Sequence, residues 1–164
     1  MGGYGGISGE EKEKNQPYKT TKGEPVKDPN AVEVAEYYIN EGNYVAFLHE
    51  NPPHNRADLS VEGHHVEVKG LTTLNPDTID KRLKEAFIQI HGDDYRYEPD
   101  TYRPGKVILL SRHDKSISEE QIYNAMYKGY EITKRKGLVT GELEFWIRGK
   151  IHIIEKIEEK KKEA

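Results

Sequence analysis

Apolar residues recur at helical spacing in three stretches of the chain. Between residues 31 and 39 they return every three or four positions, after an Asp-Pro-Asn segment at residues 28–30 that suits a helix start and before Gly42, which suits a helix end. The same period follows the Asn-Pro-Asp segment at residues 75–77 and occupies residues 118–136. The pattern therefore predicts three amphipathic helices.

Strand patterns separate these helices. Residues 44–48 form a short apolar run, and residues 57–61 and 64–69 alternate apolar with polar positions on either side of a Glu62-Gly63 turn. Residues 107–110 suit a buried strand, and residues 142–148 and 151–154 suit a terminal hairpin. The resulting order predicts an α/β protein, with an αβββαβ core in a mixed sheet flanked by helices and an added C-terminal helix and hairpin.

The two ends of the chain differ in composition from this middle part. Residues 1–25 are glycine-rich and then charged, and residues 158–164 are charged apart from the last alanine. Such segments bury too little apolar surface to offset the entropy of ordering them. We expect a flexible linker at 1–25, a single domain at 26–157 and a charged tail at 158–164, in keeping with a chain of 164 residues.

Composition and charge narrow the function classes. The chain has no cysteine, which excludes a disulfide framework, a thiolate zinc site and a cysteine nucleophile, so a metal would bind oxygen or imidazole. No apolar run approaches the roughly 20 residues of a membrane span. The net charge of −4 argues against a protein that holds nucleic acid mainly through a large positive field, although a nuclease that contacts a few phosphates is compatible with it.

The hairpin at residues 57–69 carries the candidate chemistry. Alternation predicts an apolar core face and a polar face that holds Asp58, His65, Glu67 and Lys69. With a two-residue loop at Glu62-Gly63, Asp58 lies opposite Glu67, with their Cβ atoms about 5 Å apart. Two facing carboxylates favour a hard divalent cation, Mg²⁺ by preference, with Asp58 and Glu67 as its ligands. Lys69 would then orient water or offset charge on a phosphoryl group.

A plainer interpretation stays open. In a chain that is 33% charged, Glu-x-Lys triplets arise readily, and the two acids could simply pair with Arg56 and Lys69 on a solvated sheet face. A tyrosine- and arginine-bearing loop at residues 95–104 is equally ambiguous. It could stack on single-stranded bases or pack as an ordinary loop.

The spacing of Asp58 and Glu67-Val68-Lys69 on a hairpin behind a helix resembles the PD-(D/E)xK nuclease superfamily, although Ala57 stands where that name has proline. Residues 56–70 (RADLSVEGHHVEVKG), followed by residues 75–86 (NPDTIDKRLKEA) and Gln89, resemble more closely the tRNA-nuclease C-terminal toxin domains of contact-dependent growth inhibition proteins of the CdiA type. The likeness covers roughly residues 32–111.

The resemblance implies further site residues. It places a catalytic glutamate on the first helix, and the spacing to Gly42 points to Glu33, whereas helical geometry puts Glu36 nearer the apolar stripe. It also puts Gln89 near the site, on the same flank of its helix as Arg82. His65 shares the face of Glu67 and is either a metal or phosphate contact or an ordinary exposed strand histidine.

The function implied by the resemblance is that of a metal-dependent ribonuclease toxin domain that cleaves tRNA. Such domains use a divalent metal, here expected as Mg²⁺ with Mn²⁺ or Zn²⁺ as substitutes. They form the C-terminal part of secreted or cell-surface proteins, act in the target-cell cytoplasm and are neutralised by a cognate immunity protein. The alternatives are a DNA endonuclease of the same superfamily and a non-catalytic interaction domain whose paired acids bind a partner.

Overall fold

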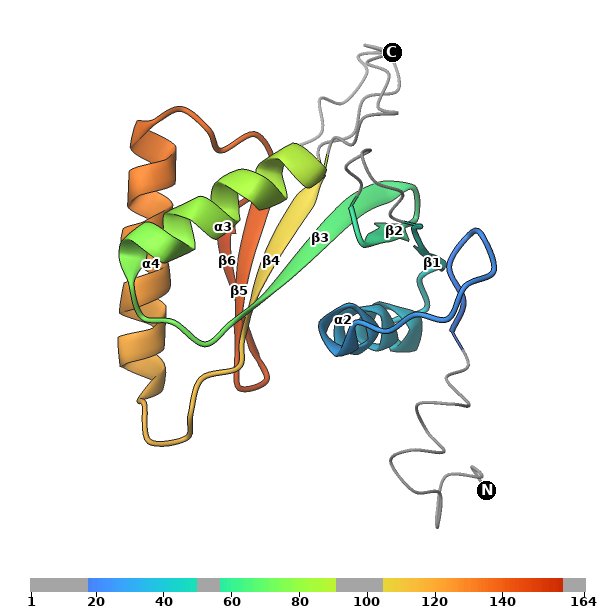
Figure 1. Ribbon diagram of the computed structural model, residues 1–164, viewed down its shortest axis with the longest axis horizontal. Coiled ribbons are helices and arrows are strands. Elements are labelled where there is room, and N and C mark those ends of the chain that lie inside the picture. Colours follow the sequence, from blue (N-terminus) through green and yellow to red (C-terminus); the bar gives the residue numbers. More distant parts are fainter. Residues whose placement is uncertain (1–17, 50–56, 91–104, 158–164) are drawn as a thin grey trace.

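The structure is a computed structural model that describes residues 18–49, 57–90 and 105–157 (Figure 1). Its helices and strands follow the order predicted from the hydrophobic pattern, with boundaries that differ by at most two residues. In chain order they are α2 (Pro29–Asn40), β1 (Val45–Phe47), β2 (Leu59–Val61), β3 (His64–Leu71), α3 (Pro76–Gln89), β4 (Lys106–Ser111), α4 (Glu119–Arg135), β5 (Glu142–Ile147) and β6 (Lys150–Glu155).

The strands form one six-stranded mixed sheet in the order β1-β2-β3-β4-β5-β6. The pairs β1–β2, β2–β3 and β5–β6 are antiparallel, whereas β3–β4 and β4–β5 are parallel. A parallel neighbour requires a long crossover, and α3 and α4 supply these two connections. The predicted α/β class is therefore confirmed, with helices on both faces of a mixed sheet.

Polar side chains at the N-caps begin each helix where the sequence pattern places a start. The Asp28 side chain accepts a hydrogen bond from the backbone N–H of Asn30, and Asn75 accepts from those of Asp77 and Thr78. Ser118 forms a capping box with Gln121. Each cap satisfies backbone donors that a first helical turn leaves without partners.

The helix α2 covers one face of the sheet. Its buried residues Ala31, Val34 and Ala35 pack with alternate residues of the strands below, and the cluster includes Leu59, Val61, Val66, Val68, Ile108, Leu110 and Trp146. Gly70 lies under the start of the helix, where an added Cβ would come within 2.5 Å of the Asn30 side chain. The apolar hairpin face predicted from the sequence is therefore the α2 face.

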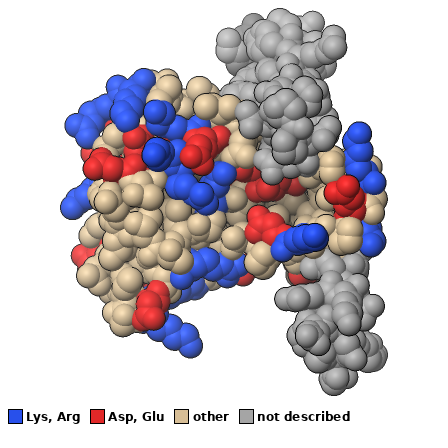
Figure 2. Space-filling model, viewed as in Figure 1, with Lys and Arg blue, Asp and Glu red and all other residues tan. Residues whose placement is uncertain are grey.

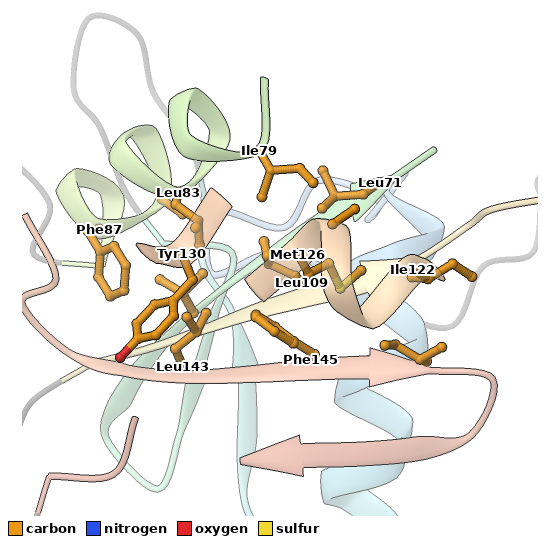
Figure 3. Packing of buried hydrophobic residues seen from close by; sticks show 14 of the residues in the cluster. Leu71, Ile79, Leu83, Phe87, Leu109, Ile122, Met126, Tyr130, Leu143 and Phe145 are labelled. Atoms are coloured by element: carbon orange, nitrogen blue, oxygen red, sulfur yellow. The ribbon is translucent and has the colours of Figure 1, made fainter. Parts of the chain in front are cut away.

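The opposite face is not the solvated polar face that alternation predicted. Helices α3 and α4 pack over it, and Figure 3 shows Leu83 and Phe87 of α3 and Met126 of α4 against Leu109 and Phe145 of the sheet. On β3 this face carries Glu67, Lys69 and then Leu71, which belongs to the same buried cluster. The prediction was wrong for Glu67, which is buried, because two crossover helices need a second apolar face to pack on.

Residues 18–25, which the sequence pattern places in the linker, form a hydrogen-bonded turn against β1 instead. Lys19 bridges Pro25, and Thr20 bridges Phe47. The Tyr18 ring packs on Phe47 with ring centroids 5.1 Å apart. Among the described residues, no helix has the length and apolarity to cross a membrane.

Candidate active site

The β2–β3 hairpin has the register that the sequence predicted. Val61 pairs with His64 and Leu59 with Val66, across a turn in which Glu62 has φ +50° and Gly63 has φ +85°. Two positive φ angles are typical of the turn type whose twist matches antiparallel strands. This register brings Asp58, one residue before β2, opposite Glu67 on β3.

The side chains of Asp58 and Glu67 each accept a hydrogen bond from the backbone of the segment that bears the other residue or its neighbour. The backbone N–H of Asp58 donates to Oε1 of Glu67 at 3.0 Å, and the backbone N–H of Val68 donates to Oδ2 of Asp58 at 3.0 Å. The regular ladder between β2 and β3 ends at Leu59, so the Asp58 carboxylate accepts a hydrogen bond from the β3 backbone beyond the ladder. The two carboxyl groups are thus fixed by backbone contacts where the strands separate.

Lys69 completes the group from the same face of β3. Its Nζ lies 3.1 Å from Oε2 of Glu67, and the two side chains are 13% and 2% exposed. A lysine held against a buried carboxylate keeps its ammonium at a defined place instead of sampling solvent. The structure therefore brings together three of the predicted residues, Asp58, Glu67 and Lys69.

Burial and proximity change the acidity of both carboxyl groups. Burial, followed by the negative charge of Asp58, raises the pKa of Glu67 to about 10, although Lys69 opposes the shift. Burial also raises the pKa of Asp58, against the hydrogen bonds from Glu67 and Val68. Because the buried carboxylate of Glu67 and the partly buried one of Asp58 repel each other, the pair favours holding a proton or a cation.

Asp28 is a contributor that the sequence pattern identified only as a helix cap. Its negative charge is a further cause of the raised pKa of Asp58. Asp28 caps α2, and its own carboxylate accepts from Asn30 at 2.9 Å. No local sequence pattern predicts that Asp28 lies near Asp58, because 30 residues separate them. Only the packing of α2 brings the two residues together.

The helix glutamates Glu33 and Glu36 make no described contact with this pair. Glu33 makes an ion pair with Arg112 at 3.0 Å, and its side chain is 47% exposed. Glu36 is exposed on α2. Both lie on the helix that covers the opposite face of the sheet from Glu67, so the described contacts do not join either residue to Asp58 or Glu67.

The predicted substrate-binding residues have different surroundings. His65 uses Nδ1 to contact the backbone carbonyl of Ile90 at 2.8 Å, which ties the start of β3 to the end of α3. A carbonyl oxygen only accepts, so Nδ1 is the donor of this hydrogen bond. Arg82 and Gln89 are partly exposed on α3, the helix that packs over the face bearing Glu67. Arg56 and the loop at residues 95–104 lie outside the described residues.

The donor set fits a hard divalent cation bound by few protein ligands. Among residues 18–49, 57–90 and 105–157, no group of three or more His, Cys, Asp or Glu side chains is arranged to hold a metal ion. Mg²⁺ is commonly bound by one or two carboxylates and keeps several waters. Asp58 and Glu67 could provide these two carboxylates. A cation between them would offset the repulsion of their negative charges.

Comparison of the chain with models of protein families, with curated proteins and with solved structures finds no match.

Proposed function

We propose that this protein is a metal-dependent endonuclease that cleaves RNA, with tRNA as its substrate, and that Asp58, Glu67 and Lys69 carry the reaction. One observation supports the proposal most directly. A buried glutamate and a partly buried aspartate, both with raised pKa values, meet a fixed lysine where β2 and β3 separate. Strongly perturbed acids with a specific charge partner are typical of functional sites.

The topology around this site also supports a PD-(D/E)xK nuclease. The chain runs through α2, three antiparallel strands, α3 and the parallel strand β4, in the αβββαβ order that the resemblance implies. Asp58 directly precedes the second strand of that order, and Glu67 and Lys69 lie on the third.

Each residue has a role that its contacts allow. A divalent cation held by Asp58 and Glu67 would neutralise their charge and polarise the scissile phosphate. The Lys69 ammonium would donate hydrogen bonds to the attacking water or to the phosphoryl oxygens on which negative charge increases. The backbone bonds to Asp58 and Glu67 would keep both carboxylates in position without further reorganisation.

RNA is the proposed substrate because of the resemblance together with the charge of the molecule. The net charge is −4, and Figure 2 shows Lys and Arg intermixed with Asp and Glu on the visible face. A site that contacts a few phosphates locally suits a folded RNA with exposed loops and ends better than long duplex DNA held by a continuous positive surface.

A single assay tests the class of activity. Total RNA, purified tRNA and duplex DNA are incubated with the protein and Mg²⁺, with and without EDTA. We expect cleavage of tRNA that EDTA abolishes. Comparable cleavage of DNA at equal protein would favour the DNA endonuclease instead. Absence of cleavage of all three by folded protein would favour a non-catalytic interaction domain.

Variants test the residues. Asp58→Ala, Glu67→Ala and Lys69→Ala should each lower the cleavage rate by roughly 100-fold or more while circular dichroism shows a folded protein. The matched control is Glu36→Gln, an exposed acid on α2, which should cleave as wild type does. Full activity of any of the three alanine variants would remove that residue from the mechanism.

We further propose, on the resemblance alone, that the domain is delivered as the C-terminal part of a contact-dependent inhibition toxin. It would act in the cytoplasm of the target cell, with Mg²⁺ there, or Mn²⁺ or Zn²⁺ in its place. A small cognate immunity protein would neutralise it by blocking access to Asp58, Glu67 and Lys69.

A further inference from the structure

A pocket lies on the α2 face, beyond the carboxyl ends of the parallel strands β4 and β5. It encloses about 420 Å³ between α2, the end of β4 and the β5–β6 hairpin. That volume falls within the roughly 300–1,000 Å³ of small-molecule sites. In open α/β sheets, ligands bind outside the carboxyl ends of the strands. The pocket belongs to the α2 face, whereas Glu67 and Lys69 lie on the face of α3 and α4.

Two aromatic rings line this pocket. Trp146 comes from β5 and Tyr37 from α2, with ring centroids 5.0 Å apart at an interplanar angle of 74°. The Trp146 indole N–H donates to Glu144 at 2.9 Å, so its one polar group is already satisfied. Tyr37 is 39% exposed. Trp146 is only 6% exposed and meets Tyr37 edge to face, so the Tyr37 ring provides most of the apolar surface on which an aromatic ligand would pack.

Two arginines line the same pocket. Hydrogen bonds to an amide, a carboxylate and two backbone carbonyls hold their guanidinium groups in place. Arg112, directly after β4, donates from Nε to Asn30 at 2.7 Å and from Nη1 to Glu33 at 3.0 Å. Arg148 donates from Nη2 to the backbone carbonyls of Asp114 and Ile117. A guanidinium has five N–H donors, so these contacts orient both groups and leave donors for a ligand.

The charges of the lining residues do not cancel. Of the residues that line the pocket, two carry a guanidinium and one, Glu33, carries a carboxylate, while Asp114 and Glu119 interact with Arg148 from outside the lining. Arginine binds phosphate oxygens through its planar fork, often with two parallel hydrogen bonds. We propose that this pocket binds a nucleoside monophosphate, with its phosphate on Arg112 and Arg148 and its base against Tyr37 and Trp146. The proposal is independent of the nuclease activity.

The backbone conformation of Arg148 indicates that its side chain has a role besides forming the turn. Arg148 and Gly149 are the two central residues of the β5–β6 hairpin, with φ +48° and +79°. Asparagine followed by glycine is the preferred pair in this turn, and an arginine with positive φ is uncommon. Arg148→Asn therefore suits the turn but loses the hydrogen bonds to Asp114 and Ile117, and it removes one of the two proposed phosphate ligands.

Titration of the wild-type protein with 5′-AMP in EDTA tests the proposal without RNA cleavage. Trp146 is the sole tryptophan of the chain, so its emission reports on the pocket directly, and calorimetry gives the affinity. We expect a saturable change in emission. Arg148→Asn should weaken binding roughly tenfold or more. Arg135→Asn, an exposed arginine at the end of α4, is the control of equal charge and should bind as wild type does.

Adenosine and inorganic phosphate, tested separately, distinguish a nucleotide site from a simple anion site. Adenosine and inorganic phosphate should each bind more weakly than 5′-AMP, because each reaches only the aromatic wall or only the arginines. Phosphate that binds as tightly as 5′-AMP would overturn the nucleotide assignment in favour of a simple anion site. No saturable response to 5′-AMP, or equal affinity in Arg148→Asn, would overturn the pocket as a nucleotide site, whatever the outcome of the cleavage assay.

Discussion

Glu67 is the residue whose chemistry depends most on its surroundings. Its pKa is raised to about 10 by burial and by the charge of Asp58, from an ordinary value of 4.5. When folding raises the pKa of an acid, the protein is most stable at pH values below the pKa of the unfolded state. Stability then falls as pH rises toward the pKa of the folded state. The raised pKa of Asp58 acts in the same direction.

The metal-free protein should therefore become less stable as pH rises from about 5 to 9. One proton taken up on folding corresponds to a slope of at most about 1.4 kcal/mol per pH unit. Glu67→Gln carries no titrating proton there and should show a much flatter profile. Thermal unfolding in EDTA between about pH 5 and 9 measures the pH dependence of stability in both proteins. Glu144→Gln, another buried acid with a lysine partner, should keep the wild-type slope. A flat wild-type profile would contradict the raised pKa.

The same pair should respond to divalent ions. Binding that is specific to the folded state stabilises by RT ln(1 + [L]/Kd), or roughly 2.7 kcal/mol at 100 times Kd. Mg²⁺ or Mn²⁺ should raise the melting temperature of the wild type, and Asp58→Asn should lose most of that shift because it removes one ligand charge. Calorimetry with EDTA and with millimolar metal measures both proteins.

The control for this loss is Asp80→Asn. Asp80 is a buried aspartate between α3 and α4 that pairs with Lys136 and Thr133, away from the acidic pair. The substitution should lower stability but leave the metal-induced shift in place. An unchanged shift in Asp58→Asn would mean that the ion binds elsewhere, and the two-carboxylate site would have to be abandoned.

At the scale of the elements, the two crossover helices meet at Gly129 of α4. A Cβ there would lie 2.5 Å from Cγ2 and 2.6 Å from Cβ of Ile79, and 3.1 Å from the Pro76 carbonyl. These atoms lie on or close to the backbone of α3, so they cannot move without shifting the helix. The close approach of α3 and α4 therefore depends on the absence of a side chain at this position.

Gly129→Ala should destabilise the protein by about 1–2 kcal/mol. Alanine gains about 1 kcal/mol of helix propensity, but overpacking a tight contact costs about 1–3 kcal/mol and the clash here is with poorly movable atoms. Denaturant unfolding measures the balance. Asn124→Ala, exposed on the same helix, isolates the propensity effect and should be neutral or slightly stabilising. A stabilised Gly129→Ala would show that α3 can yield at this contact.

The whole molecule combines a modest net charge with intermixed surface charges (Figure 2). If it is a tRNA-cleaving toxin domain, expression of the chain in bacteria without a neutralising partner should arrest growth. Lys69→Ala, expressed to the same level, should restore growth because it removes the ammonium next to Glu67 without an added charge or bulk. Growth curves and tRNA integrity on gels measure both. Normal growth with abundant, folded wild-type protein would argue against the toxin proposal.

Local chemistry was enough to predict the elements and the acidic pair. Apolar spacing located the helices and strands, and the segments that begin with Asp28 and Asn75 marked two of the helix starts. Strand alternation and a two-residue turn also determine hairpin register, so the opposition of Asp58 and Glu67 could be derived from residues within ten positions of each other. These properties depend on neighbours in the chain.

Tertiary packing decided the environment of those residues. Glu67 is buried because α3 and α4 cover a face that alternation alone marks as polar, and Asp28 acts on Asp58 because α2 folds back over the sheet. The same packing pairs Glu33 with Arg112 and forms the pocket of Trp146 and Arg148 from segments more than 100 residues apart. No local period encodes such contacts, since they arise only when separate elements bury their apolar faces against one another.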